Sequence, residues 1–238
     1  MRIIFRQLFD EASSTCTYLL ADPLTADAVL IDGVREHTGA YLSLLQEYGL
    51  QLRWTLETHV HADHVTAAAS LREMTGARTA VSEHGGADCA DRKLADGDTI
   101  VFGDEVIRVI ATPGHTPGCL TYRWGDRIFT GDALLIDGCG RTDFQSGDAG
   151  TLYDSITQRL MTLPDETLVY PGHDYKGRRV SSIGEQKAGN PRLAGKSRDE
   201  FIDIMANLQL PPPQQIDVAL PANQACGRRP EAMLVQGA

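Results

Sequence analysis

The chain has 238 residues, of which 42% are hydrophobic and 23% are charged, values typical of a folded globular protein rather than a disordered one. This length can bury one hydrophobic core, so we expect a single domain over residues 1–238. The formal net charge of −10 repels phosphate backbones, which argues against a nucleic-acid partner.

The first half of the chain alternates strand-like and helix-like segments. Short apolar stretches between turn residues predict strands at residues 2–9, 15–21, 28–32 and 52–58. Apolar residues at helical spacing predict one helix that ends at Gly49 and another over residues 65–74 that ends at Gly76. The predicted strand at 52–58 leads directly into a group of histidines.

The second half is richer in strands and changes character near its end. Strands are predicted at residues 99–101, 106–111, 120–124, 127–130 and 167–170, with an amphipathic helix around 152–160. Ser197 and Glu200 have the spacing of a capping box, so residues 197–238 should form one helix followed by an extended tail. Two strand-rich halves with helices between them suggest two sheets packed together under helices, which periodicity alone leaves as either an α/β or an α+β fold.

The five cysteines do not predict a structural sulfur site. Their number is odd and no C-x-x-C pair exists, so we expect neither a disulfide framework nor a thiolate zinc site. The first residues lack the features of a secretory signal, and no apolar run reaches the roughly 18 residues that span a bilayer. We therefore expect a cytoplasmic protein in a reducing compartment, without a membrane partner.

Ligand-type side chains follow four of the predicted strands. The histidine-rich segment after residue 58 is followed by later loops, and together they contain His59, His61, Asp63, His64, His115, Asp132 and His173. Imidazole and carboxylate groups are ligands that zinc, iron and manganese accept. Exposed loop histidines would explain one such residue, but not an ordered set at strand ends. The sequence therefore predicts a metal site on loops held by a sheet.

The order of these residues resembles the signature of the metallo-β-lactamase superfamily. H-x-H-x-D-H is followed by a loop histidine, then Gly-Asp, then Gly-His, between His59 and His173. This resemblance implies an αββα sandwich with the metal at one edge, between the two sheets. It says little about the reaction, because members of the superfamily include thioesterases, nucleases and dioxygenases.

A second resemblance, to the persulfide dioxygenases, covers nearly the whole chain. It rests on THVHADHVTAA, ATPGHTPGCLTY, FTGDALLIDGCGRTDFQ, YPGHDYKG, NPRL and LPPPQQIDVALPANQACG. The resemblance implies oxidation of glutathione persulfide by O2 to sulfite and glutathione, with one Fe(II) per chain bound by His59, His115 and Asp132. Two histidines and one carboxylate leave about three coordination positions of such an iron free for other ligands.

The remaining ligand-type residues could belong to a second metal or to an outer shell. Hydrolases of the superfamily use residues of the same types as His61, Asp63, His64 and His173 in a two-zinc site. The types of the ligands alone therefore do not determine how many metal ions bind. We interpret these four residues as groups that orient the iron ligands or water.

The resemblance places the substrate contacts at Tyr175 and Arg192. Arg192 could pair a glutathione carboxylate bidentately, or it could be a solvated residue of a turn. Arg141 is a further candidate that could instead hold its own loop. Cys139 fits a small buried residue better than a reactive thiol. The family also suggests a homodimer, and any sulfurtransferase partner is expected to be a separate chain.

Three other functions compete with the dioxygenase. A glyoxalase II-type hydroxyacylglutathione thioesterase would use the same fold and tripeptide, with a dinuclear metal site that makes hydroxide. The short C-terminal segment fits this alternative less well. A nucleic-acid hydrolase is disfavoured by the acidic charge. A non-catalytic metal-binding scaffold would not explain why the chain has so many possible ligands for an open metal site.

Overall fold

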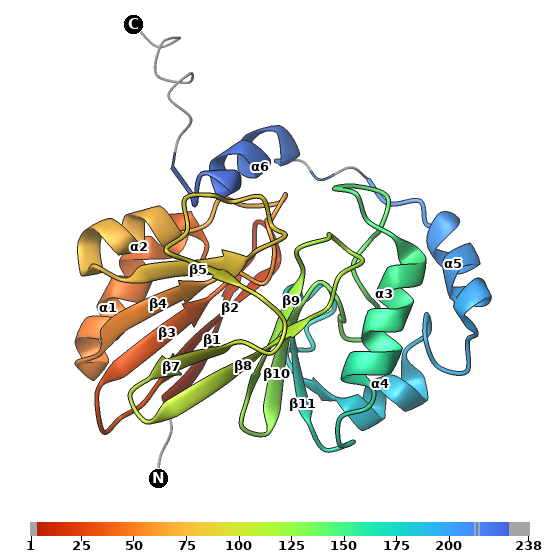
Figure 1. The fold of residues 1–238 in the computed structure, drawn as a ribbon, viewed down its shortest axis with the longest axis horizontal. Helices are drawn as coiled ribbons and strands as arrows, with labels where there is room; N and C mark the ends of the chain where they lie inside the picture. Colours follow the sequence, from red (N-terminus) through yellow and green to blue (C-terminus); the bar gives the residue numbers. More distant parts are fainter. Residues whose placement is uncertain (1–3, 212, 214, 229–238) are drawn as a thin grey trace, which may run out of the picture.

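Two mixed six-stranded sheets pack face to face in the computed structural model, which describes residues 4–211, 213 and 215–228 (Figure 1). The first sheet has the order β1 (Ile4–Asp10), β2 (Thr15–Ala21), β3 (Asp27–Ile31), β4 (Gln51–Leu56), β5 (Arg78–Ser82) and β6 (Arg92–Leu94). The second has the order β12 (Ser181–Ser182), β11 (Leu168–Pro171), β10 (Arg127–Gly131), β9 (Leu120–Trp124), β8 (Glu105–Ala111) and β7 (Thr99–Phe102).

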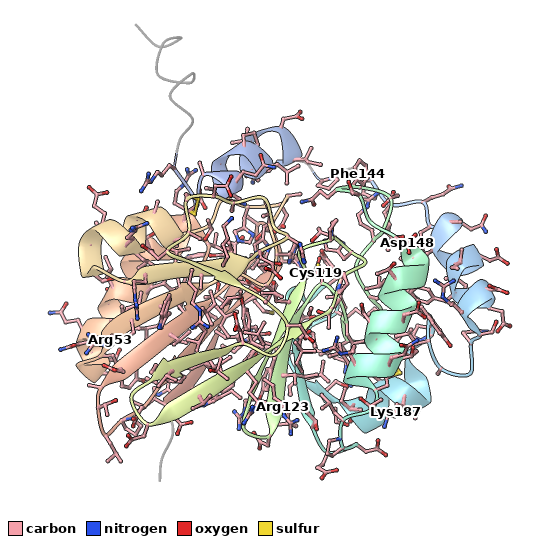
Figure 2. The ribbon with its side chains drawn as sticks, viewed as in Figure 1. Arg53, Cys119, Arg123, Phe144, Asp148 and Lys187 are labelled. Atoms are coloured by element: carbon pink, nitrogen blue, oxygen red, sulfur yellow. A yellow bond between two sulfur atoms is a disulfide. The ribbon has the colours of Figure 1, made fainter. Side chains whose placement is uncertain are left out.

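Helices cover the outer face of each sheet. On the first sheet these are α1 (Thr38–Tyr48), preceded by a 3-10 turn (Arg35–His37), and α2 (Ala68–Thr75). On the second they are α3 (Ala149–Ser155), which continues as a π-helical turn (Ile156–Leu160), α4 (Ile183–Gly189) and α5 (Arg198–Ala206). Asp148 caps α3 by accepting a hydrogen bond from the backbone N–H of Thr151 (Figure 2). The predicted αββα sandwich is confirmed.

The main core lies between the two sheets. Tyr18 of β2 and Phe129 of β10 meet there with ring centroids 4.8 Å apart. Tyr18 also donates a hydrogen bond of 2.6 Å to the backbone carbonyl of Pro171 in β11, which satisfies its buried hydroxyl. β2 is buried on both faces because α1 and α2 cover its outer side.

One edge of the sandwich collects the ends of strands from both sheets. β3, β4 and β5 are parallel, and so are β10 and β11, so the carboxyl ends within each group point the same way. The backbone N–H of Cys16 donates to the carbonyl of Gly172 at 2.8 Å and ties the two sheets together there. Side chains on the loops after these strands are therefore brought close to one another.

The C-terminal part differs from the sequence prediction. Instead of an extended tail, α6 (Ile216–Gln224) follows α5 and lies over the strand-end edge (Figure 1), while residues 229–238 lie outside the described part. Pro221 interrupts helical hydrogen bonding, so local pattern disfavours this helix, and its contacts with the rest of the protein stabilise it.

The expectation of no disulfide was also wrong. Cys89 and Cys226, 137 residues apart, form a disulfide with a Cα–Cα distance of 5.9 Å. Spacing along the chain could not reveal this pair, because only the fold brings the two residues together. Among the described residues, no helix is long and apolar enough to cross a membrane.

Candidate metal centre

Residues 57–66, which we call the histidine loop, follow β4 at the strand-end edge and carry His59, His61 and His64. The carboxylate of Asp32, at the end of β3, accepts hydrogen bonds from the backbone N–H of Thr58 at 2.7 Å and from its hydroxyl at 2.8 Å. Asp32 is buried and has a φ of +52°. The start of the histidine loop is thus fixed by the neighbouring parallel strand.

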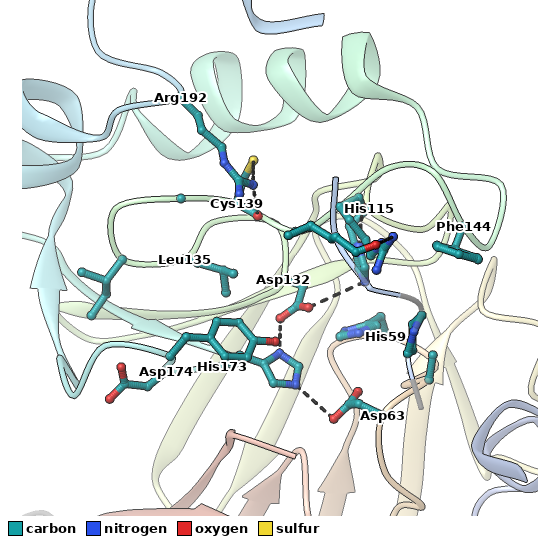
Figure 3. A pocket seen from close by; sticks show the side chains of 18 of the residues that line it. His59, Asp63, His115, Asp132, Leu135, Cys139, Phe144, His173, Asp174 and Arg192 are labelled. Carbon is teal, nitrogen blue, oxygen red and sulfur yellow. Dashed lines mark hydrogen bonds and ion pairs between the residues drawn. The ribbon is translucent and has the colours of Figure 1, made fainter. Parts of the chain in front are cut away.

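Three predicted ligands, His59, His115 and Asp132, converge from three separate loops. They offer one ligand atom each, and these atoms lie within 4.8 Å of one another. Nε2 of His115 is 3.7 Å from Oδ2 of Asp132, and the rings of His59 and His115 are 5.0 Å apart (Figure 3). All three residues are at least nine-tenths buried. Two imidazoles and one carboxylate form a set that suits a divalent transition metal.

Hydrogen bonds fix which imidazole nitrogen is free to bind a metal. Nδ1 of His115 donates to the backbone carbonyl of Arg141 at 2.6 Å, since a carbonyl can only accept. The Thr58 hydroxyl gives its proton to Asp32, so it accepts from Nδ1 of His59 at 3.0 Å. Both rings therefore leave Nε2 as the lone-pair nitrogen, the arrangement expected of metal-binding histidines.

His173 links Asp132 to Asp63. Its Nδ1 lies 2.6 Å from Oδ1 of Asp132, and its Nε2 lies 3.0 Å from Oδ2 of Asp63 (Figure 3). Burial acts to lower the pKa of His173, but the two carboxylates outweigh it and hold that pKa well above its ordinary value. Burial likewise acts to raise the pKa of Asp132, and the charge of His173 keeps it below the usual range. The link leaves Oδ2 of Asp132 for a metal.

His61 lies beside His59, with ring centroids 4.1 Å apart, but does not belong to the three-residue set. Its Nε2 lies 3.1 Å from Oδ1 of Asp32 and 3.6 Å from Oε2 of Glu57. Although burial opposes it, the neighbouring carboxylates raise the pKa of His61, while burial raises that of Glu57. The carboxylates thus engage Nε2 of His61, whereas its buried Nδ1 has no hydrogen-bond partner in the part of the chain that the structure describes.

A second group of possible ligands remains beside the first. His61, Asp63 and His64 also offer ligand atoms within 4.8 Å of one another. Nδ1 of His64 lies 2.8 Å from Oδ2 of Asp63, whereas its buried Nε2 has no partner in the part of the chain that the structure describes. The geometry keeps this group available for a second cation.

A cavity of about 450 Å³ opens onto the candidate metal ligands. Tyr175 lies on its wall with its ring parallel to His173 at 5.6 Å, and 68% of the residue is exposed. Phe144, on the loop between β10 and α3, forms another part of the wall (Figure 3). The volume of the cavity suits a small peptide-sized ligand beside the metal site.

Both candidate arginines line this cavity, but they are already engaged. Arg141 makes two hydrogen bonds of 2.7 Å to Asp143 and one of 2.6 Å to the carbonyl of Pro211. Arg192 is partly buried and donates through Nη1 to the carbonyl of Cys139 at 2.7 Å (Figure 3). Arg141 therefore holds loops together, whereas Arg192 keeps further N–H groups for a ligand.

Cys139 is structural in this arrangement. Its side chain is buried beside Met205, with 3.7 Å between the two sulfur atoms. Burial raises the pKa of its thiol, which keeps it protonated and weakly nucleophilic.

Several residues that organise the site were missed by the sequence analysis. Asp32 and Thr58 fix the start of the histidine loop, and Asn223 of α6 binds its backbone. A single acidic residue directly after an apolar strand was the available signal for Asp32. No local signal marks Asn223, because its partners lie more than 150 residues away.

Comparisons with known proteins agree with this geometry. Residues 13–173 match the family model described as the metallo-beta-lactamase superfamily. The chain is 50% identical over 228 residues to the Homo sapiens protein named persulfide dioxygenase ETHE1, mitochondrial, with 94% of this chain and 89% of that one covered. The crystal structure of ETHE1 from Myxococcus xanthus has 58% identity and a TM-score of 0.93, and the match covers 94% of this chain and 100% of that chain.

A further relative is similar at lower identity. Glyoxylase B2 from Dictyostelium discoideum is 28% identical over 262 residues, with 92% of this chain and 89% of that one covered. The stronger similarities reported above extend well beyond residue 173, so they include C-terminal helices that the superfamily model does not reach.

Proposed function

Because this chain belongs to the metallo-β-lactamase superfamily and, within it, to the persulfide dioxygenases, we propose that it oxidises glutathione persulfide with O2 to sulfite and glutathione. One Fe(II) per chain is bound by His59, His115 and Asp132. The observation that carries this assignment is the convergence of their ligand atoms within 4.8 Å, with the second nitrogen of each imidazole already hydrogen-bonded. Residues 1–238 act as one catalytic domain.

The donor set fits ferrous iron and leaves coordination positions open. When bound, the iron supplies the redox chemistry that activates O2 for addition to the terminal sulfur. The protein keeps the ligand geometry ready for this reaction. Asp32 fixes the loop that bears His59, and His173 keeps Asp132 anionic and oriented. The largely apolar cavity wall limits access of water to the reacting sulfur.

The tripeptide part of the substrate occupies the cavity. Glutathione carries two carboxylates, and a chain with a net charge of −10 needs local donors to bind them. Arg192 offers its remaining N–H groups, and Tyr175 offers a hydroxyl at the cavity wall. Arg141 contributes indirectly, because its guanidinium is held by Asp143 and its backbone carbonyl orients His115.

A glyoxalase II-type thioesterase is the second candidate. The unpartnered Nε2 of His64 and its neighbours Asp63 and His61 favour it, because they could bind the second metal that such hydrolysis requires. Against it, identity to Glyoxylase B2 is only 28%, whereas identity to the human persulfide dioxygenase is 50%.

Other aspects of the proposal concern the surroundings of the enzyme. A homodimer and a separate sulfurtransferase that delivers the persulfide both remain predictions. A cytoplasmic location is a prediction too, since the human relative is named as mitochondrial.

The decisive experiment measures both reactions on one iron-loaded preparation. Oxygen consumption is followed with glutathione persulfide, sulfite is quantified, and hydrolysis of S-lactoylglutathione is assayed in parallel. We expect rapid O2 uptake, sulfite release and about one iron per chain. Thioester cleavage without O2 uptake, together with two metals per chain, would establish the hydrolase instead.

A further inference from the structure

The helix α6 is seated directly on the histidine loop. Ala219 and Ala222 of α6 form a small buried cluster with Val65. Gly227, with a φ of +86°, lies so close to the loop that a Cβ at this position would overlap the carbonyl oxygen of Thr66. Two separate contacts therefore press the C-terminal segment against the part of the chain that bears the candidate metal ligand His59.

Asn223 fastens this contact with both of its amide N–H groups and with its side-chain oxygen. Its Nδ2 donates to the carbonyls of His61 at 2.9 Å and His64 at 2.8 Å. Its Oδ1 accepts from the backbone N–H of Thr66 at 2.9 Å. Asn223 is 5% exposed, so two carbonyls and one N–H in a buried setting lose their partner if the side chain is removed.

A disulfide holds Asn223 in place. Cys226 lies three residues after it and is bonded to Cys89, on the segment between β5 and β6. Cys226 is buried, whereas Cys89 is partly exposed and within reach of a reductant. The same segment is also linked to α6 through the contact of the Cys89 sulfur with the carbonyl of Gln224 at 3.3 Å. α6 is thus tied at its end to the first sheet.

We propose that Asn223 is a positioning residue for the metal centre, and that the Cys89–Cys226 disulfide makes the hydrogen bonds of Asn223 to the histidine loop sensitive to thiol reductants. Reduction by a dithiol breaks the S–S bond and yields two thiols, with two electrons and two protons taken from the dithiol, which itself becomes a disulfide. The freed segment can then withdraw Asn223 and leave the carbonyls of His61 and His64 unpaired. This inference rests on the proposed function only in placing the metal at His59.

The first test replaces Asn223 and measures the loop without any substrate. Asn223→Ala removes all three hydrogen bonds, and Asn223→Asp keeps the size and the acceptor for Thr66 but not the amide donors. Hydrogen exchange of residues 57–66 in the metal-free protein, and the rate of iron release to a chelator, should both rise at least about tenfold in each variant. Gln224→Ala, an exposed change on the same turn, should behave as the unchanged protein.

A spectroscopic measurement separates positioning from general stability. The visible spectrum of the cobalt-loaded protein depends on the arrangement of its ligands, so it should change in Asn223→Asp and stay the same in Gln224→Ala. Unchanged spectra, loop exchange and iron release in both Asn223 variants would overturn the positioning role. Because neither O2 nor persulfide is present, these outcomes do not depend on the reaction being the proposed one.

The second test addresses the disulfide. The protein is reduced with dithiothreitol, its free thiols are blocked, and the reagents are removed before hydrogen exchange and iron release are measured. Both rates should rise toward those of Asn223→Ala. Cys89→Ser should show the raised rates without reduction and no further response to it. Reduced protein with the rates of the oxidised form would overturn the redox coupling.

Discussion

Arg192→Ala should weaken substrate binding far more than it slows the chemical step. A hydrogen bond from a charged donor to a carboxylate is worth about 1.5–3 kcal/mol, which corresponds to a KM raised roughly 10- to 150-fold. The turnover number should change little, because Arg192 lies on the cavity wall rather than among the candidate metal ligands. Arg192→Lys keeps the charge but not the planar guanidinium, so its KM should lie between that of the unchanged protein and that of Arg192→Ala.

The same change has a structural cost that must be measured separately. Removal of Arg192 leaves the carbonyl of Cys139 without its 2.7 Å donor. One lost hydrogen bond of about 1 kcal/mol should lower the Tm by about 2–4 °C in a chain of this size.

The assay is steady-state O2 uptake at varied persulfide concentration, with Tm recorded for each variant. Arg53→Ala is the matched control. Arg53 lies on β4, away from the cavity, and forms an ion pair with Asp27 at 2.6 Å (Figure 2). An unchanged KM in Arg192→Ala would refute the carboxylate contact and leave this arginine with its loop-holding role alone.

Three further variants test other parts of the structure. Asp132→Ala should lose iron and activity together. The control Asp22→Ala, at a buried carboxylate beside the β7–β8 turn, should keep its iron. Iron content is measured by metal analysis, and an iron-replete Asp132→Ala protein would contradict the ligand role. His61→Ala should retain about one iron per chain, since His61 faces Asp32, and complete metal loss would make it a ligand. Phe129→Ala should cost about 3–5 kcal/mol of unfolding free energy in a denaturant titration, and a loss under 1 kcal/mol would mean that the core repacks.

Most of the strands could be predicted because their signals are local, whereas the αββα fold was expected from the resemblance to the metallo-β-lactamase superfamily. β9 begins and ends at the predicted residues, and β2 does as well, since apolar runs between turn residues define both. Strand ends and motifs marked seven candidate ligands, and the resemblance to the persulfide dioxygenases singled out His59, His115 and Asp132 among them. Their convergence in one cluster, expected from strand ends at a common edge, is what the structure adds.

Features that depend on distant parts of the chain escaped prediction. β6 has only three residues, too few for a periodic pattern, and its pairing with β5 defines it. α6 contains a proline, which local reasoning treats as a stop, and its stability comes from Val65 and from the backbone that Asn223 binds. The disulfide joins residues 137 positions apart. In each case the deciding interaction is tertiary.

The division of the candidate iron ligands between the two sheets bears on how the protein matures. His59 follows β4 in the first sheet, whereas His115 and Asp132 lie on loops of the second. A nascent chain that has emerged from the ribosome only as far as β8 carries three histidines of the histidine loop but no complete ligand set. The proposed ligand set is therefore complete only after β10 has formed, so a chain interrupted earlier cannot hold a metal with all three residues.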